Sequence, residues 1–242
     1  MSNNMSANQI ESRRRSRPVQ KRSKVEAIKR NKPAMFLAIA IVIMLVLSVF
    51  YVILGNEEDT EEDTCDYQND PEYLSAINGT TYPVAVIEVK DKCAMAIELY
   101  DDKMPITCNN FIRLVEDGFY DGMIFHRTSD DFMIQTGSTF PDGTTKESPY
   151  GNIQFETSDV KHVDGAISMA STAAGVGGSS QFFICDGEQS FLDGNYAAFG
   201  KLIYGWDTLR DIADDPQDDS SPAGGGKPLT DIIINRIYIA QE

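Results

Sequence analysis

The sequence predicts a mainly β domain, in which short strands close into a barrel with two helices, preceded by a single transmembrane helix. Three observations lead to this fold class. From about Thr80 onward, short apolar runs are separated by turn residues, which is typical of a closed barrel. Two segments, near residues 105–117 and 206–213, have the apolar spacing of helices. Before them, residues 34–54 form one uninterrupted apolar stretch.

Residues 34–54, AMFLAIAIVIMLVLSVFYVIL, predict the transmembrane helix. These 21 residues contain no charge and no proline. A helix of about 20 residues spans a hydrocarbon core about 30 Å thick, because each residue adds about 1.5 Å. A cleaved signal peptide is the alternative, but the run is longer than a usual signal core and no A-x-A cleavage site follows it.

The charges differ on the two sides of this segment. Residues 1–33 contain ten Lys and Arg against two Glu, a net +8, whereas residues 55–242 carry −24. Because basic flanks stay in the cytoplasm, we expect residues 1–33 to form a basic cytoplasmic tail and residues 55–242 to lie outside. This arrangement resembles a surface protein of the Gram-positive type. The acidic outer part and the lack of aromatic residues in the tail argue against binding of nucleic acid.

Residues 55–78 predict an extended acidic linker, because nine Asp and Glu between Glu57 and Glu72 repel one another. Residues 79–242 then form the folded domain.

Four cysteines follow the apolar segment: Cys65, Cys93, Cys108 and Cys185. An external location permits disulfides, and four cysteines allow three pairings. Cys93 and Cys185 fall in apolar, strand-like segments, where a free cysteine acts as a small hydrophobic residue. We therefore expect free thiols. The spacings match no zinc site.

The elements of the domain can be assigned in chain order. The expected strands are residues 83–88, 94–100, 123–126, 132–135, 166–170, 182–185, 197–203 and 232–239. Pro105 suits the first turn of a helix, and Gly118 suits its end. A second helix is expected at residues 206–213, followed by a polar loop at residues 214–227.

The usual catalytic patterns are missing from the sequence. His126 and His162 are its two histidines, and neither has the spacing of a metal ligand pair. No G-x-S-x-G motif is present. The glycine-rich run GVGGSSQ at residues 175–181 precedes a strand rather than a helix, which excludes a phosphate-binding loop.

Three strand-like segments instead combine apolar residues with isolated polar groups. They are residues 125–135, 167–184 and 191–200. Because side chains alternate along a strand, Met133 and Gln135 share one face, as do Gln181 and Phe183. This pattern predicts a groove with an apolar pocket, amides that hold a peptide backbone, and one cation, Arg127. A barrel core with a few polar surface residues is the plainer alternative.

These segments resemble the cyclophilins, the peptidyl-prolyl cis-trans isomerases built on an eight-stranded barrel. The resemblance rests on FHR-x4-FMIQ-x-G, SMA, SQFFI and LDG-x4-FG in this order, and it extends from about Thr80 to Glu242. It implies an eight-stranded antiparallel barrel capped by two helices, with Arg127 as the catalytic residue. It also implies a proline pocket and groove formed by Phe132, Met133, Gln135, Ala170, Ser171, Thr172, Gln181, Phe183, Phe191, Leu192 and Tyr196.

The chemistry of prolyl isomerisation is compatible with Arg127. Rotation of an X–Pro bond is slow because twisting destroys amide resonance, a barrier of roughly 18–20 kcal/mol. In the twisted state the prolyl nitrogen regains its lone pair, and a guanidinium can donate a hydrogen bond to it. This requires no nucleophile, so we expect no metal and no cofactor. On its strand His126 should face away from Arg127 and make internal hydrogen bonds as a structural residue.

The chain departs from the family pattern beside Arg127. Residues 128–131 read TSDD, where relatives usually have an apolar pair followed by proline and glycine. Asp130 and Asp131 bring negative charge to the edge of the groove. They either pair with Arg127 or favour substrates with basic residues beside proline.

Two further departures concern the predicted proline pocket. Phe191 stands where relatives often have a tryptophan whose indole N–H contacts the inhibitor cyclosporin. Phenylalanine has no donor, so we expect weak cyclosporin binding with isomerase activity retained. Tyr196 replaces a histidine of many relatives and can still line the pocket.

The sequence thus predicts a membrane-anchored, monomeric prolyl isomerase that acts on proline-containing segments of exported proteins outside the membrane. Two other functions stay open. In the first, the loop at residues 128–131 weakens catalysis and leaves a proline-peptide binding module or chaperone on the cell surface. In the second, the domain is a scaffold that acts through its acidic surface. The presence of Arg127 favours the enzyme, because a pure binding module does not need it.

Overall fold

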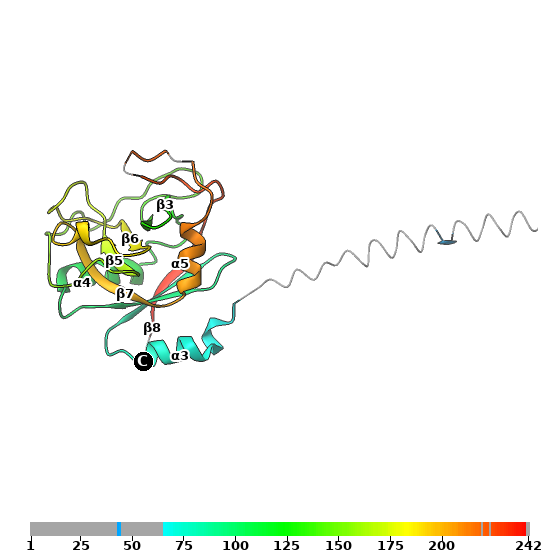
Figure 1. Cartoon of the computed structure of the whole chain (residues 1–242), viewed down its shortest axis with the longest axis horizontal. Coiled ribbons are helices and arrows are strands. Elements are labelled where there is room, and N and C mark those ends of the chain that lie inside the picture. The colour runs from blue at the N-terminus through cyan, green and yellow to red at the C-terminus, as the bar shows by residue number, and fades with distance from the viewer. Residues whose placement is uncertain (1–42, 45–64, 219, 223, 241–242) are drawn as a thin grey trace, which may run out of the picture. The chain divides into compact units, whose positions relative to one another are not determined.

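The computed structural model describes residues 43–44, 65–218, 220–222 and 224–240 (Figure 1). The chain divides into two units, Met1–Thr60 and Glu61–Glu242, and in the first only Ile43 and Met44 are described. The expected tail and nearly all of the expected transmembrane segment therefore lie outside the described residues. Within the described part of the chain, no helix has both the length and the apolar character needed to cross a membrane.

The second unit is built around one sheet of eight antiparallel strands (Figure 1). The strands are β1 (Val84–Val89), β2 (Met95–Leu99), β3 (Arg127–Ser129), β4 (Met133–Thr136), β5 (Ala166–Met169), β6 (Phe182–Cys185), β7 (Ala197–Tyr204) and β8 (Ile234–Ala240). Their order across the sheet is β3-β4-β6-β5-β7-β2-β1-β8. The prediction of eight antiparallel strands is confirmed.

The sheet forms a half-barrel, so the prediction of a closed barrel is wrong. In the described residues β3 and β8 end the sheet on opposite sides, and an isolated bridge between Ile124 and Ile233 connects the segments that precede them. Phe125 donates its backbone N–H to Ile232 at 3.0 Å. These separate bonds replace a continuous ladder, so the strand expected at residues 123–126 is only an isolated bridge at Ile124, and β3 follows it in the chain.

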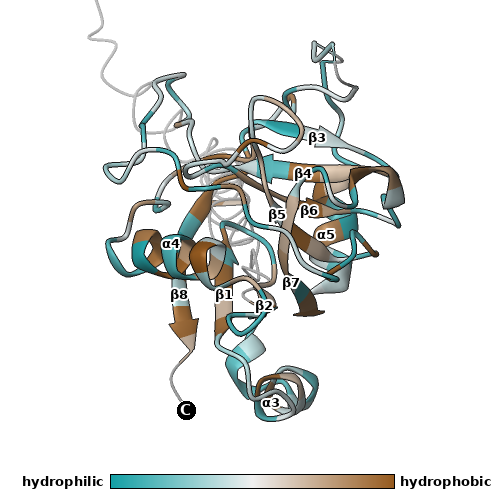
Figure 2. Ribbon diagram, turned by 90° about the vertical axis from the view of Figure 1, so that its left-hand side faces the viewer, coloured by the Kyte–Doolittle hydropathy of each residue, from teal (hydrophilic) through white to brown (hydrophobic). Residues whose placement is uncertain are grey.

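Two helices, α4 (Pro105–Glu116) and α5 (Trp206–Ala213), cover the inner face of the sheet, as their apolar spacing predicted. Phe111 and Leu114 of α4 and Leu209 and Ile212 of α5 are fully buried in one core with strand residues such as Ile97. Figure 2 shows that α4 has both hydrophobic and hydrophilic parts, as expected of a helix with one buried face. The inner face of the sheet is thus filled by the buried side chains of the core.

A third helix, α3 (Pro71–Asn78), was not predicted. Residues 65–78 were expected to be extended linker, but they form α3 and a short 3-10 helix, η3 (Tyr67–Asn69). Asp70 begins α3 by accepting a hydrogen bond from the Glu72 N–H at 2.8 Å. The buried ring of Tyr73 packs edge-on against Tyr204 of β7 at 5.4 Å. Burial of these tyrosines stabilises the helix, in which Glu72 is the single acidic residue.

A disulfide joins Cys65 to Cys93, so the prediction of free thiols is wrong for this pair. Cys93 lies in the turn between β1 and β2 rather than in a strand, and Cys65 precedes η3 and α3. The other two cysteines are free and fully buried, as predicted. Burial raises the pKa of Cys185 to about 12 and also raises the pKa of Cys108.

A thiol reagent tests this assignment. We expect two reactive thiols in the unfolded, unreduced chain and none in the native chain, because Cys108 and Cys185 are fully buried. The disulfide closes a loop with a sequence separation of 28 residues. Replacing both Cys65 and Cys93 by serine should therefore lower the free energy of unfolding by about 3 kcal/mol, measured in urea. Four reactive thiols in the unreduced chain would contradict the disulfide.

Candidate active site

The candidate site lies on the outer face of the sheet, where β3, β4 and β6 are neighbours. Arg127 of β3 is paired with Gln135 of β4, and Gln135 is paired with Phe183 of β6. Their side chains therefore form one row across three strands. The residues between them, such as Ile134 and Ile184, belong to the core, because side chains alternate along a strand.

A pocket of about 430 Å³ opens at this row and brings together the catalytic residue and most of the binding residues that the sequence predicted. It is lined by Arg127, Phe132, Met133, Gln135, Ala170, Ser171, Thr172, Phe183, Phe191, Leu192 and Tyr196. Met133, Phe183 and Leu192 are buried and belong to one apolar cluster, which gives the pocket an apolar floor. A side chain of the size and character of a proline ring suits such a floor.

The predicted residue Gln181 lines a second, neighbouring pocket of about 170 Å³. The two pockets share Gln135, Ala170, Ser171 and Thr172. Sequence reasoning missed the remaining lining residues: Asn152, Gly177, Gly178 and Ser179.

The glycine-rich run that contains Gly178 was the available signal for this second pocket. A Cβ atom at Gly178 would lie 2.3 Å from the Ala170 carbonyl oxygen, so only glycine permits this approach of two backbones. Gly177, Gly178 and Ser179 of this run line the second pocket. Close packing explains Gly177 and Gly178, whereas Gly175 has a positive φ of +69° and no atom of the described residues within 4 Å of its Cβ position.

A chain of hydrogen bonds holds the Arg127 side chain at the pocket wall. Arg127 Nη1 donates to Gln135 Oε1 at 3.1 Å, and Gln135 Nε2 donates to Gln181 Oε1 at 2.9 Å. On its other side, Arg127 Nε donates to the backbone oxygen of Gly224 at 3.0 Å. The guanidinium thus has a defined orientation. Gly224 is a partner that sequence reasoning did not find.

Arg127 is a partly buried cation beside an aromatic ring. Its guanidinium carbon lies 5.6 Å from the centroid of the Phe132 ring. Burial lowers the pKa of Arg127 from its ordinary value, and Tyr196 opposes this shift. An arginine nevertheless remains charged in proteins, so the pocket contains a permanent donor at its edge.

Three aromatic side chains form the rim of the pocket. Phe132 and Phe191 are stacked with ring centroids 5.9 Å apart, and Phe191 is 65% exposed. Tyr196 packs edge-on against Phe183 at 6.2 Å. Phe191 lies in η4 (Ser190–Leu192), a short 3-10 helix that turns its ring toward solvent and its neighbour Leu192 toward the pocket floor.

His162 fixes the segment that follows η4. Its ring is buried, with Nδ1 3.0 Å from Asp193 Oδ1 and Nε2 2.9 Å from Ser168 Oγ. These contacts tie residue 193 to β5 beneath the rim. They are the contacts expected of a structural histidine.

His126 has one ring nitrogen that lacks, among the described residues, the internal hydrogen bond expected of it. The expected internal hydrogen bonds are missing at Nδ1, which is buried and has no hydrogen-bond partner within the described residues. Burial lowers the pKa of His126, and Gln181 opposes the shift. A neutral imidazole is therefore favoured beside the Arg127 cation.

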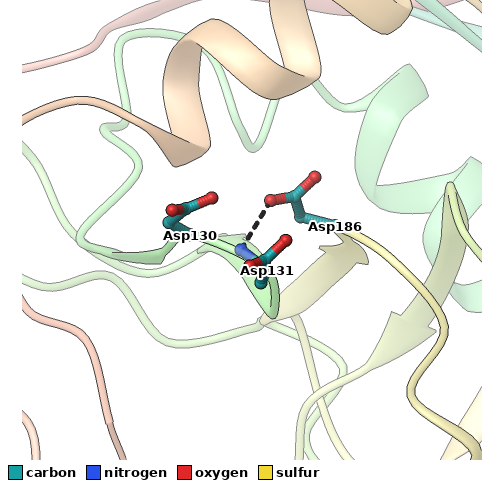
Figure 3. Close-up of side chains that lie close together, drawn as sticks. All are labelled: Asp130, Asp131 and Asp186. Carbon is teal, nitrogen blue, oxygen red and sulfur yellow. Dashed lines mark hydrogen bonds between the residues drawn. The ribbon is translucent and has the colours of Figure 1, made fainter.

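The loop expected at residues 128–131 is shorter in the structure, because Thr128 and Ser129 belong to β3. The turn that follows places Asp130 and Asp131 near Asp186, as Figure 3 shows. Carboxylate oxygens of Asp130, Asp131 and Asp186 lie within 4.8 Å of one another. The Asp131 backbone N–H donates to Asp186 Oδ2 at 2.9 Å, and Arg210 donates to Asp186 Oδ1. Both oxygens of Asp186 already accept hydrogen bonds from protein donors, so we propose no metal site here.

This acidic group extends to the end of α5. A side-chain hydrogen bond with Asp130 raises the pKa of Asp214 from its ordinary value, and repulsion between the two carboxylates raises it further. Asp131 is joined to Phe132, which lines the pocket. Negative charge therefore lies directly beside the rim of the site.

Comparisons with known proteins agree with this geometry. The sequence profile of the family described as "Cyclophilin type peptidyl-prolyl cis-trans isomerase/CLD" matches residues 84–239. The chain is 38% identical over 146 residues to "Peptidyl-prolyl cis-trans isomerase-like 3" of Gallus gallus, covering 59% of this chain and 88% of the relative. It is 41% identical over 117 residues to a peptidyl-prolyl cis-trans isomerase of Synechococcus elongatus, covering 48% and 78%.

The fold is also similar to a solved structure. A Cryptosporidium parvum cyclophilin type peptidyl-prolyl cis-trans isomerase, crystallised in the presence of the dipeptide Ala-Pro, matches with a TM-score of 0.58 and 35% identity. The match covers 66% of this chain and 99% of that chain. This chain therefore belongs to the cyclophilin-type peptidyl-prolyl cis-trans isomerase family.

Proposed function

We propose that this chain accelerates the rotation of X–Pro peptide bonds, with Arg127 as the catalytic residue. The position of the Arg127 guanidinium carries the proposal: it lies at the wall of an apolar pocket and is held there by Gln135. The family membership of the chain supports the same activity. The substrates are proline-containing polypeptides.

The proposed mechanism needs no bond to form or break. The apolar floor made by Met133, Phe183 and Leu192 holds the proline ring, while the chain on the other side of the bond rotates. As the amide twists, its nitrogen becomes a hydrogen-bond acceptor, and Arg127 donates to it. The donor is already oriented, so this stabilisation is larger in the transition state than in the planar ground state.

The position of the turn that contains Asp130 and Asp131 favours the enzyme over a weak binding module. A binding module was expected if the two aspartates disturbed Arg127. Asp131 instead bonds through its backbone to Asp186, and the carboxylates gather around Asp186. Arg127 Nη1 donates to the neutral amide of Gln135 at 3.1 Å.

The proposal includes a location outside a membrane, where a monomer anchored by residues 34–54 assists the folding of exported proteins. The charge difference across that segment supports it, as does the disulfide between Cys65 and Cys93, because disulfides persist in oxidising compartments. Fractionation of expressing cells tests the location. The full chain should stay with membranes through a high-salt wash and dissolve only in detergent, and its release by salt would contradict the anchor.

Replacement of Arg127 by alanine tests the catalytic role. The full chain, kept in a mild detergent, should accelerate cis-to-trans relaxation of an X–Pro peptide, which takes about tens of seconds without a catalyst. We expect Arg127→Ala to reduce kcat/KM by roughly 10²- to 10³-fold, the usual cost of losing one oriented donor. Peptide affinity should change little, because the pocket floor is intact.

Arg127→Lys is the matched control for charge. Lysine keeps the cation but not the planar arrangement of donors, so we expect activity between those of the native chain and Arg127→Ala. An Arg127→Ala chain that is folded and fully active would refute the proposed mechanism.

Asp130 and Asp131, which lie beside the rim of the pocket, should give the enzyme a preference for the charge of its substrate. Peptides with lysine beside proline should react faster than peptides with glutamate there, by up to about fivefold, because exposed ion pairs contribute at most about 1 kcal/mol. The preference should weaken as salt concentration rises. Asp130→Asn combined with Asp131→Asn should remove it, whereas Glu116→Gln at the exposed end of α4 should not. Equal rates for both peptides would rule out this role of the aspartates.

Phe191 should make the enzyme weakly sensitive to cyclosporin. Its exposed ring has no hydrogen-bond donor. Phe191→Trp adds an indole N–H at the same place, so we expect inhibition to become about fivefold tighter, the value of one added hydrogen bond near 1 kcal/mol. Isomerase activity without inhibitor should be similar in both chains. Nanomolar inhibition of the native chain would contradict this prediction.

A further inference from the structure

A loop that follows α5 contacts the outer edge of β3, the strand that contains Arg127 (Figure 1). This loop, residues 217–228, begins and ends at a bridge between Gln217 and Pro228. Inside it, the Asp218 N–H donates to Lys227 O at 3.0 Å, and the Ser221 N–H donates to Gly225 O at 3.0 Å. The described residues of loop 217–228 are thus bonded to one another across the loop.

Two backbone hydrogen bonds attach loop 217–228 to the middle residue of β3. The Thr128 N–H donates to Gly226 O at 2.9 Å, and the Gly226 N–H donates to Thr128 O at 3.1 Å. Since β4 occupies the other edge of β3, the loop acts as its second neighbour. This attachment sets where the Gly224 carbonyl lies, two residues away, and that carbonyl accepts the Nε–H of Arg127 at 3.0 Å.

The side chain of Gln217 joins the loop to β3 a second time. Its Oε1 accepts a hydrogen bond from Thr128 Oγ1 at 3.1 Å and another from the Gly226 N–H at 3.2 Å. Thr128 is fully buried, so the loss of this acceptor would leave a buried hydroxyl unsatisfied. One amide oxygen therefore holds the strand and the loop together beside Arg127.

The orientation of a guanidinium depends on its Nε–H as well as on its terminal nitrogens. Arg127 is fixed at Nη1 by Gln135 and at Nε by Gly224, on opposite sides of the side chain. Two anchors restrict the rotation of a long side chain that would otherwise have several torsions free. A misplacement of about 1 Å at a catalytic group can reduce a rate by about 10²-fold.

We propose that Gln217 is a positioning residue, which holds loop 217–228 on β3 so that the Gly224 carbonyl directs the Arg127 guanidinium into the pocket. This inference rests on the proposed function of Arg127. Gln217 is not among the residues that line the pocket, so it acts on the reaction only through its neighbours.

Two substitutions at Gln217 separate positioning from folding. Gln217→Ala removes the acceptor oxygen, and we expect kcat to fall by roughly tenfold with KM nearly unchanged, less than the ~10²-fold loss for a 1 Å misplacement. Gln217→Glu keeps an acceptor oxygen at the same distance from the backbone, so activity should be close to native. Both are measured on the full chain in detergent with the X–Pro relaxation assay.

A second pair of variants tests the attachment of the loop without changing Gln217. Gly225 has φ +72°, and a Cβ there would lie 2.1 Å from Thr128 O, so Gly225→Ala must push the loop away from β3. Gly143 has a similar φ of +81° with no atom within 4 Å of its Cβ position. Gly143→Ala is therefore the matched control for backbone strain. We expect the loss in kcat for Gly225→Ala and not for Gly143→Ala.

The decisive measurement combines Gln217→Ala with Arg127→Ala. If Gln217 acts through Arg127, its substitution has no further effect on the residual rate once the arginine is gone. The proposal is overturned if Gln217→Ala leaves kcat of the native background unchanged. It is equally overturned if the same loss of rate occurs in the Arg127→Ala background, because the residue then acts on the fold alone.

A spectroscopic measurement keeps this inference distinct from the proposed function. The Arg127 Nε–H signal in a ¹⁵N-labelled chain is identified by its absence in Arg127→Ala. The Arg127 Nε proton should exchange with solvent slowly in the native chain and rapidly in Gln217→Ala. If the native chain proves inactive, the proposed function fails, and this signal still decides the inference: unchanged exchange in Gln217→Ala overturns it.

Discussion

The alternation of side chains along β4 and β6 is the constraint on which the rest of the domain depends. Ile134 and Ile184 point into the core, and their neighbours Gln135 and Phe183 point into the pocket. A shift of one residue in the pairing of these strands would exchange the two faces. The packing of the core therefore fixes the geometry of the site, because both are made by the same short strands.

The location of Arg127 on the edge strand is the second feature that shapes the site. A central strand has neighbours on both sides and a fixed environment, whereas β3 has β4 on one side and loop 217–228 on the other. Edge strands have backbone groups that need partners, and the loop supplies them for Thr128. The cation thus lies between a rigid strand and a loop, and both contribute a hydrogen bond to its side chain.

The outer face of β1 and β7 has a different role from the outer face of β4 and β6. There α3 covers Val84, Val86 and Tyr204, so these strands are buried on both faces. The disulfide between Cys65 and Cys93 ties the segment that precedes α3 to the β1–β2 turn. One half of the sheet exterior is therefore used for stability and the other for the pocket.

The sequence by itself determined the short strands, the helices α4 and α5, and the residues of the pocket, because period-two and helical spacing are local and the pocket residues lie in compact motifs. It did not determine α3 or the disulfide. Apolar residues on both faces of β1, such as Val86 and Ile87, were the signal that something covers this strand. The acidic composition of residues 55–78 instead favoured an extended linker. Only the tertiary structure decided that the barrel stays open and that Gly224 and Gln217 lie beside Arg127. Those contacts join residues about ninety positions apart, and a polar loop has no periodicity from which its neighbour could be inferred.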